Sequence, residues 1–305
     1  MTSSGTRASE VRGARRILCC SLLALSLTSA AGTGSLAASA DDQAPRRICS
    51  VSLAADELLA MLVPASRVVC VTSFADDEAS SNVVGHYPDR TLRVTARIEP
   101  VLGQQPDLVV ASPWNSAEFL DLLEKSGIDS LVLGEMSSFP EIRDELLRLG
   151  EALGEKERAA GIVRDMDLRL AQLAKKRETL EERPRVLSFS HLIVAGEGTS
   201  VDALIEAAGG INAADELGVE GHQKVSMEAI LGLDPDLLLL GFEPDATLAD
   251  VLGAYPHLES LRAVSEDRVV LLAPRELTTV TPHLLDTAER LAMDFHRHAA
   301  EREAP

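Results

Sequence analysis

Seven residues with aromatic, imidazole, amide or guanidinium side chains are the candidates for contacts with a bound molecule. They follow apolar runs or lie in polar loops, and they are Tyr87, Trp114, Asn115, His191, His222, Phe242 and Arg275. Trp114, for example, follows the apolar run 108–111, and Phe242 follows the run 237–240. If these runs are strands of parallel sheets, the candidates lie near the carboxyl ends of the strands, where open α/β sheets bind ligands.

The aromatic candidates favour a flat apolar ligand. Aromatic residues make up only 3% of the chain, yet Tyr87 and Trp114 both fall on expected loops. A corrin or a porphyrin would offer the planar surface that such side chains cover. The alternative is that both side chains anchor their loops to their own part of the fold.

Two further contacts with such a ligand are open. Tyr87 or His86, opposite His191 or His222, could ligate haem iron, although a single histidine on a loop is more often a surface residue. Carboxylates of a ligand could be bound by guanidinium groups, which could equally form a solvated face. The guanidinium groups in question are those of Arg90, Arg93, Arg97 and Arg275. We predict no metal held by protein side chains alone and no resident cofactor.

Strand-like runs and amphipathic segments alternate along the chain in two blocks, residues 46–153 and 184–300. Strands that are separated by helices form parallel sheets. At 305 residues the chain also exceeds the size of one ordinary core. We therefore predict two α/β lobes, in which residues 74–97 form a long polar loop.

One long amphipathic helix is predicted between the two blocks, within residues 154–183. Gly154 precedes the segment and Pro184 follows it. Apolar residues recur mostly every three or four positions from residue 155 to 183, which corresponds to a helix of about 43 Å. Such a helix would connect the lobes rigidly, whereas the alternative is an ordinary surface helix or half of a coiled coil.

The two blocks share a repeated segment. Residues 98–111 and 227–240 are identical at six positions, at a constant offset of 129. Each copy reads as a short helix, a break at Gly and Pro, and an apolar run that suits a strand covered on both faces. The repeat indicates that the two lobes are copies of one unit.

The first 40 residues have the pattern of a secretion signal. Four arginines precede the apolar stretch 17–27, and an A-x-A cleavage site ends at Ala40. Arg15 and Arg16 leave a twin-arginine signal open beside the general export route. No other apolar run reaches the length of a membrane-spanning helix, so we expect an exported protein in the periplasm.

The charge of the chain excludes one class of partner. The net charge is −19, and removal of the leader, which carries four Arg and one Glu, leaves −22. Such an acidic protein repels nucleic acids and anionic lipids. Attraction to a basic partner surface and solubility alone explain the charge equally well.

Only Cys49 and Cys70 remain after the leader. Each lies in an apolar, strand-like run, so neighbouring strands could bring them together in a disulfide in an oxidising compartment. Two buried free thiols explain the pattern as well. Two cysteines are too few for an all-cysteine zinc or iron–sulfur site.

These features together resemble the substrate-binding proteins of ABC importers for vitamin B12, haem and ferric siderophores. The resemblance covers about residues 46–295, and the paired Glu-x-Val/Ile-Leu…Pro-Asp-Leu segments around the long helix are its most specific part. The family implies an α/β fold of two Rossmann-like lobes with parallel sheets, joined by one long rigid α-helix. It implies a monomer that binds a metal chelate between the lobes. The Tyr87-Pro88 pair is also similar to a pair in the family's first lobe.

The same resemblance implies a membrane partner. In the family, one exposed Glu on each lobe docks on basic pockets of the permease dimer, and the matching positions are Glu99 and Glu228. Charge pairing at two separate points would orient the complex and speed encounter. The alternative is that each Glu only stabilises the N-terminus of its helix.

Two other functions are compatible with the sequence. An enzyme on a Rossmann-like scaffold is disfavoured because the sequence has no phosphate-binding glycine motif and no nucleophile-elbow or zinc-protease motif. A periplasmic carrier or sensor domain without a permease would share the fold and the ligand. Among chelates, we favour a corrinoid over haem or a ferric siderophore because of Tyr87 and Trp114.

Overall fold

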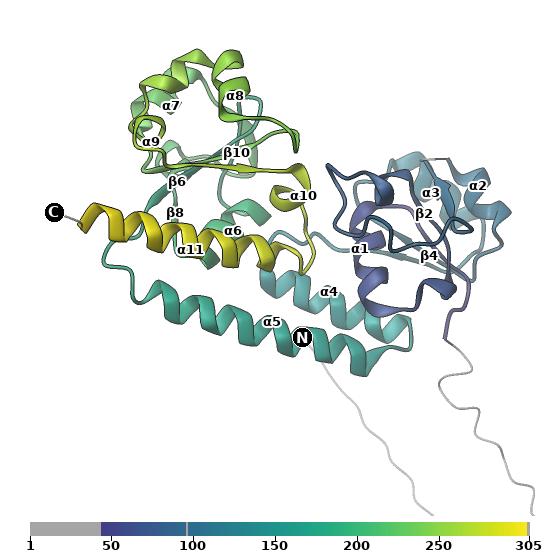
Figure 1. The fold of residues 1–305 in the computed structure, drawn as a ribbon. Helices are drawn as coiled ribbons and strands as arrows, with labels where there is room; N and C mark the ends of the chain where they lie inside the picture. Colours follow the sequence, from purple (N-terminus) through teal and green to yellow (C-terminus); the bar gives the residue numbers. More distant parts are fainter. Residues whose placement is uncertain (1–43, 96, 304–305) are drawn as a thin grey trace, which may run out of the picture. The chain divides into compact units, whose positions relative to one another are not determined.

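The computed structural model describes residues 44–95 and 97–303, all of which belong to one compact unit, Ser39–Pro305 (Figure 1). The predicted signal peptide and its cleavage site after Ala40 lie outside the described residues. Within the described part of the chain, no helix combines the length and the apolar character that a bilayer crossing requires.

The first lobe contains a five-stranded parallel sheet of strand order β3-β2-β1-β4-β5. Its strands are β1 (Ile48–Ser50), β2 (Val68–Thr72), β3 (Leu92–Val94), β4 (Leu108–Ala111) and β5 (Ser130–Val132). Side chains alternate between two buried faces: Leu108 and Val110 join one core cluster, and Val109 and Ala111 join another. Strand β3 lies within residues 74–97, so the prediction of a continuous loop there is wrong.

The second lobe contains a four-stranded parallel sheet of order β11-β10-β6-β8. Its strands are β6 (Arg185–Phe189), β8 (Ile211–Asn212), β10 (Leu237–Gly241) and β11 (Val269–Leu272). Strands β7 (Ile193–Ala195) and β9 (His222–Lys224) form a separate antiparallel pair. His222, which was predicted to lie in a loop, is therefore the first residue of a strand.

Helices cover both faces of each sheet, as in doubly wound α/β folds. The first lobe contains α1 (Leu53–Leu62), η2 (Ala65–Arg67), η3 (Ser73–Asp76), α2 (Ile98–Gly103), α3 (Ala117–Lys125) and α4 (Phe139–Ala152). The second lobe contains α6 (Ser200–Ala208), η4 (Ala213–Leu217), α7 (Met227–Leu233), α8 (Leu248–Ala254), η5 (Pro256–Ser260), α9 (Arg262–Ser265), α10 (Pro274–Leu277) and α11 (Leu284–Glu303). The element order confirms the predicted parallel α/β architecture.

Helix α5 (Lys156–Arg177) connects the lobes and packs against α4, α6 and α11. In Figure 1 it runs beside the yellow α11. Gly150 of α4 permits the close approach of α5, since a Cβ atom there would lie 2.3 Å from the Cβ of Ala159. Arg169 of α5 adds ion pairs with Asp286 and Glu289 of α11, at 2.6 and 2.9 Å. The connection is therefore fixed along its length by apolar and charged contacts.

The predicted boundaries of two helices are wrong. Helix α5 ends at Arg177 and not at residue 183, because a turn closes there: Thr179 Oγ1 donates to the carbonyl of Lys176 at 2.7 Å. In the sequence, Thr281 followed by Pro282 predicts an N-cap and the first position of the last helix, but helix α11 begins at Leu284. The Thr281 hydroxyl donates to a carboxylate of the other lobe.

The repeated segment has the same structural role in both lobes. Helix α2 leads into β4 and helix α7 leads into β10, and each of these strands pairs with the first strand of its lobe. The Pro-Asp-Leu aspartate accepts a hydrogen bond from the backbone N–H of the arginine at that first strand: Asp107 from Arg47 at 2.9 Å, and Asp236 from Arg185 at 3.0 Å. The aspartate N–H donates back to the arginine carbonyl in each case.

The arginine side chains complete this arrangement. Arg47 donates to the carbonyls of Gln104 and Gln105, and Arg185 donates to those of Leu233 and Asp234, which are the corresponding residues at the offset of 129. Gln105 and Asp234 both have positive φ, 49° and 40°. We call this pairing of Arg47 with Asp107, and of Arg185 with Asp236, the Arg–Asp lock. The aspartate of the Pro-Asp-Leu motif therefore has the same role in both lobes.

Cys49 and Cys70 form a disulfide. The two residues are opposite one another on the neighbouring strands β1 and β2, and both are fully buried. Of the two alternatives that the sequence leaves open, the structure contains the cross-linked one.

Candidate functional site

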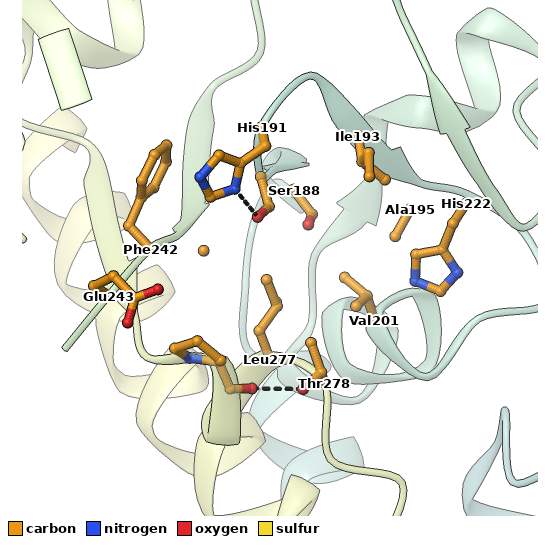
Figure 2. Close-up of a pocket in the computed structure, with 13 residues that line it drawn as sticks. Ser188, His191, Ile193, Ala195, Val201, His222, Phe242, Glu243, Leu277 and Thr278 are labelled. Atoms are coloured by element: carbon orange, nitrogen blue, oxygen red, sulfur yellow. Dashed lines mark hydrogen bonds between the residues drawn. The ribbon is translucent and has the colours of Figure 1, made fainter. Parts of the chain in front are cut away.

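A cavity of about 340 Å³ lies in the second lobe, where β6, β10 and β11 end. Figure 2 shows His191 and Phe242 on one side and His222 on the other, beside Ala195 and Val201. The lining residues are Ser188, Ser190, His191, Ile193, Ala195, Val201, His222, Gly241, Phe242, Glu243, Pro274, Leu277 and Thr278. Three of the predicted ligand contacts therefore face one cavity at the carboxyl ends of a parallel sheet.

Aromatic rings form one wall of this cavity. The ring centroids of His191 and Phe242 are 5.0 Å apart, and those of Phe242 and Tyr255 are 6.2 Å apart. Phe189 lies behind them, 6.4 Å from Phe242. Offset and edge-on ring contacts of this kind hold aromatic side chains in place. The wall offers a flat apolar surface with one imidazole at its edge.

His191 and Leu192 form the two-residue turn between β6 and β7. Ser190 and Ile193 exchange both backbone hydrogen bonds across the turn, at 3.0 and 2.8 Å. Both turn residues have positive φ, 51° and 66°, a conformation in which hairpin turns usually have Asn or Gly. The turn places the His191 ring beside Phe242, with Ser190 Oγ 3.2 Å from His191 Nδ1.

A second cavity, of about 490 Å³, is lined by residues of both lobes. The lining residues are Ala54, Ser112, Trp114, Gly134, Glu135, Met136, Ser137, Gly198, Thr199, Ser200, Gly221, His222 and Val280. Trp114 is 85% exposed, so its ring is available at this cavity. His222 lines both cavities, which therefore adjoin at this residue. We refer to the two cavities together as the cleft.

Asn115 is a structural residue of its loop and lines neither cavity. Its side-chain oxygen accepts from the Ser112 N–H at 2.8 Å, and its amide donates to the carbonyl of Val51 at 2.9 Å. It thereby fixes the loop that carries Trp114.

Tyr87 also lines neither cavity. It is only 3% exposed, and its hydroxyl donates to the carbonyl of Asp56 at 2.5 Å. Burial, together with the nearby carboxylates of Asp56 and Glu57, raises the pKa of Tyr87. As the structure stands, Tyr87 anchors its loop to the first lobe, which is the alternative that the sequence leaves open.

The arginines that were considered for ligand carboxylates bind elsewhere. The Arg275 guanidinium donates to the carbonyl of Glu78, and the Arg275 N–H donates to that of Ala79 at 2.9 Å. Arg93 pairs with Asp76 at 2.7 Å, which lowers the pKa of that carboxyl. Arg90 and Arg93 line a separate depression of the first lobe, and Arg97 is the N-cap residue of α2.

Glu57 of α1 binds the two lobes to each other, a role that sequence reasoning missed. The side chain is 2% exposed and accepts from the Asn82 N–H and side-chain amide, at 3.1 and 2.9 Å. It also accepts from the hydroxyls of Thr279 and Thr281 in the second lobe, at 2.8 and 2.6 Å. Asn82 donates in turn to the carbonyl of Arg275 at 3.0 Å. Two adjacent carboxylates, Asp56 and Glu57, in an otherwise apolar helix were the available sequence signal.

Asp56 lies beside Glu57 in the sequence but faces its own lobe. It is fully buried and accepts from the Thr72 N–H at 3.2 Å and from the Thr72 hydroxyl at 2.5 Å. Burial raises the pKa of Asp56 to about 7, although hydrogen bonds from Ser50 and Thr72 oppose the change. This carboxyl therefore changes its charge near neutral pH.

Glu99 and Glu228 occupy equivalent positions in the first turns of α2 and α7, and both side chains are exposed. The Ser226 hydroxyl caps α7, and hydrogen bonds from the helix N-terminus and Ser226 lower the pKa of Glu228. Helix α2 has no side-chain cap. Neither glutamate lines the cleft.

Two α/β lobes with parallel sheets, a connecting helix and a ligand-sized cleft at the carboxyl ends of the strands define a two-lobed binding protein. The chain belongs to the periplasmic binding protein family, whose model matches residues 48–276. The predicted family and fold class are thereby confirmed.

Curated relatives match most of the chain. A cobalamin-binding protein of Halobacterium salinarum is 28% identical over 267 residues, which cover 84% of this chain and 70% of the relative. An uncharacterised ABC transporter substrate-binding lipoprotein, YvrC of Bacillus subtilis, is 26% identical over 261 residues, with coverages of 83% and 80%.

Solved structures share the fold. A periplasmic haem-binding protein of Pseudomonas aeruginosa has a TM-score of 0.70 at 26% identity, over 83% of this chain and 93% of that chain. The vitamin B12-binding protein BtuF of Vibrio cholerae has a TM-score of 0.65 at 22% identity, over 84% and 98%. The latter similarity shows the fold alone.

Proposed function

We propose that this protein is exported, captures a metal chelate in the cleft and delivers it to the permease of an ABC importer. The observation that supports this most strongly is the cleft itself, with an aromatic wall and two imidazoles at the carboxyl ends of the strands. Family membership supports transport as the purpose of binding. The connecting helix and the Glu57 contacts favour capture by small movements rather than by wide closure of the lobes.

A corrinoid is the chelate that we favour. The exposed Trp114 and the wall around Phe242 offer flat apolar surfaces on different lobes. A cobalamin-binding protein is among the relatives, which is in line with this choice. Haem is the second candidate, because His191 and His222 could each present an imidazole to its iron. A ferric siderophore is a third.

A titration of the mature protein tests ligand capture. Cyanocobalamin, haemin and a ferric hydroxamate siderophore would be added separately, and the fluorescence of Trp114, the only tryptophan, would be followed with an inner-filter control. We expect saturable quenching by cyanocobalamin at micromolar concentration or below. A shifted Soret band that is lost in His222→Ala would identify haem. The absence of binding by every chelate in calorimetry would contradict the proposal.

We further propose that Glu99 and Glu228 dock on basic pockets of the permease. Both are exposed, and the repeat gives them the same position in each lobe. Glu99→Arg combined with Glu228→Arg should lower uptake at least about tenfold, because attraction becomes repulsion at two points, while chelate affinity stays unchanged. Glu118→Arg with Glu259→Arg is the matched control, since both residues are exposed helical glutamates outside the repeat. Equal uptake by the two double variants would contradict docking through these glutamates.

A further inference from the structure

We propose that the cleft selects chelates with uncharged amide or hydroxyl groups at their periphery and discriminates against chelates that carry carboxylates. This inference rests on the proposed function, and it specifies the chemical class of the ligand. It is derived from the charges and polar groups at the two cavities.

The charged groups at the cleft are all of one sign. Among the described residues that line the two cavities, the ionised side chains are Glu135 and Glu243, and no lysine or arginine is present. Glu135 follows β5 in the first lobe, and Glu243 follows β10 in the second. A ligand that contacts both lobes therefore meets a carboxylate on each.

The cationic residues that are close to lining residues in the sequence do not add a positive charge to the cleft. Arg275 lies between Pro274 and Leu277, which both line the cleft, but its guanidinium donates to the carbonyl of Glu78. Lys224 is exposed at the end of β9, two residues after His222, and lines neither cavity. A propionate in the cleft would lose part of its hydration without gaining a guanidinium or ammonium partner.

The remaining polar groups suit amides. Hydroxyls line both cavities, and hydroxyls can donate to an amide oxygen or accept from an amide N–H. They belong to Ser188, Ser190 and Thr278 in one cavity and to Ser112, Ser137, Thr199 and Ser200 in the other. The imidazoles of His191 and His222 can also donate or accept when neutral. Thr199 and Thr278 already donate to the carbonyls of Gly196 and Pro274, so a macrocycle fringed with amides would find its hydrogen-bond donors among the serine hydroxyls and the imidazoles.

The test compares two ligands that differ in one group: cyanocobalamin and its monocarboxylic acid, in which one peripheral propionamide is hydrolysed. Calorimetry would give both dissociation constants for the mature protein. We expect the acid to bind at least about tenfold more weakly, since a like charge a few ångströms away at an effective dielectric constant near 20 has an effect of this order. Haemin, with two propionates, should be weaker still.

Variants assign the effect to the two glutamates. Glu135→Gln combined with Glu243→Gln should lower the ratio of the two dissociation constants, acid over cyanocobalamin, severalfold. Most of this change should come from tighter binding of the acid. The control is Glu259→Gln combined with Glu266→Gln, which changes the net charge by the same amount at exposed residues outside the cleft. It should leave the ratio of the dissociation constants unchanged.

The possible failures can be told apart. Equal or tighter binding of the acid, or of haemin, would overturn the inference and leave chelate capture standing. The inference would also be overturned if the Glu135/Glu243 double variant kept the same ratio of dissociation constants, because the discrimination would then have another source. Failure of cyanocobalamin, its acid, haemin and the ferric hydroxamate siderophore to bind at all would contradict the proposed function and this inference with it.

Discussion

The two lobes share one framework. In each, a repeat helix leads through a loop with a residue at positive φ into a strand that pairs with the first strand of the lobe, and the Arg–Asp lock joins the two. The first long helix of each lobe is capped in the same way: Ser52 accepts from the Ala55 N–H, and Thr199 accepts from that of Asp202. The parts that differ are additions to this common unit.

The additions are of different kinds. The first lobe contains a disulfide between central strands and a buried carboxyl, Asp56. At the corresponding positions the second lobe has Leu187, two residues after the arginine of its lock, and Ala203, four residues after its helix cap. The second lobe instead has the β7–β9 pair, with His191 and His222, around an apolar cavity. The shared framework therefore determines where the cleft lies. The inserted β7–β9 pair determines many of the side chains that line it.

The largest expected effect concerns Asp56. Its folded-state pKa is raised, so the folded protein binds more protons than the unfolded chain between about pH 4 and pH 7. The contribution of Asp56 to the free energy of unfolding is therefore present at low pH and is lost as the pH rises through this window, by about 4 kcal/mol at most. Asp56→Asn should remove this slope, as measured by urea denaturation at several pH values.

The control is Glu157→Gln, which removes an exposed carboxylate of α5 and should preserve the slope of the parent protein. If Asp56→Asn and the parent lost stability in parallel from pH 5 to pH 8, the buried carboxyl would titrate as in the unfolded chain. The contrast with Ala203 in the second lobe would then have no consequence for pH dependence.

The next effect concerns the disulfide, which occurs in one lobe only. Cys49 and Cys70 are 21 residues apart in sequence, and closing a loop of this size stabilises a folded chain by about 3 kcal/mol in the chain-entropy model. Cys49→Ala combined with Cys70→Ala should lower the free energy of unfolding by about that amount, with additional loss from the smaller side chains.

A reducing agent provides the matched control. The parent protein should lose stability in denaturation with dithiothreitol, whereas the double variant should be insensitive to it. Hydrogen exchange should show the loss in strands β1 and β2 first. If the parent protein had the same free energy of unfolding under oxidising and reducing conditions, the disulfide would contribute nothing to stability.

Much of the framework could be predicted from sequence because it depends on local signals. Ser52, Gly209 and the repeat each indicate a helix start, a helix end or a helix–strand unit within a few residues. Short polar strands could not be predicted: β9 reads His-Gln-Lys and is exposed throughout, so it has no alternation of apolar and polar residues.

Polar contacts between residues far apart in the sequence could not be predicted either. Thr281 looks like a helix cap in sequence, but its hydroxyl donates to Glu57, 224 residues away. For the same reason, the site could be predicted only in part. His191, His222, Phe242 and Trp114 line the cleft, whereas Tyr87 and Arg275 are bound to backbone carbonyls that no local pattern indicates.

The smallest expected effect concerns the two copies of the Arg–Asp lock, which we expect to contribute unequally to the free energy of unfolding. Asp107 is exposed, whereas Asp236 is half-buried and also accepts from Arg262 at 2.9 Å. Removing an acceptor of a charge-assisted hydrogen bond costs more where its partners are shielded from water. We therefore expect Asp236→Ala to lower the free energy of unfolding by about 2 kcal/mol and Asp107→Ala by about 1 kcal/mol.

Urea denaturation of both variants, beside Asp144→Ala as an exposed control, measures the difference. Equal losses at both positions would show that the lock contributes through its shared backbone hydrogen bonds alone. A larger loss for Asp236→Ala that disappears in an Arg262→Met background would assign the difference to the additional ion pair. The two lobes would then have the same lock, strengthened in the lobe that forms the apolar cavity by one arginine outside the repeat.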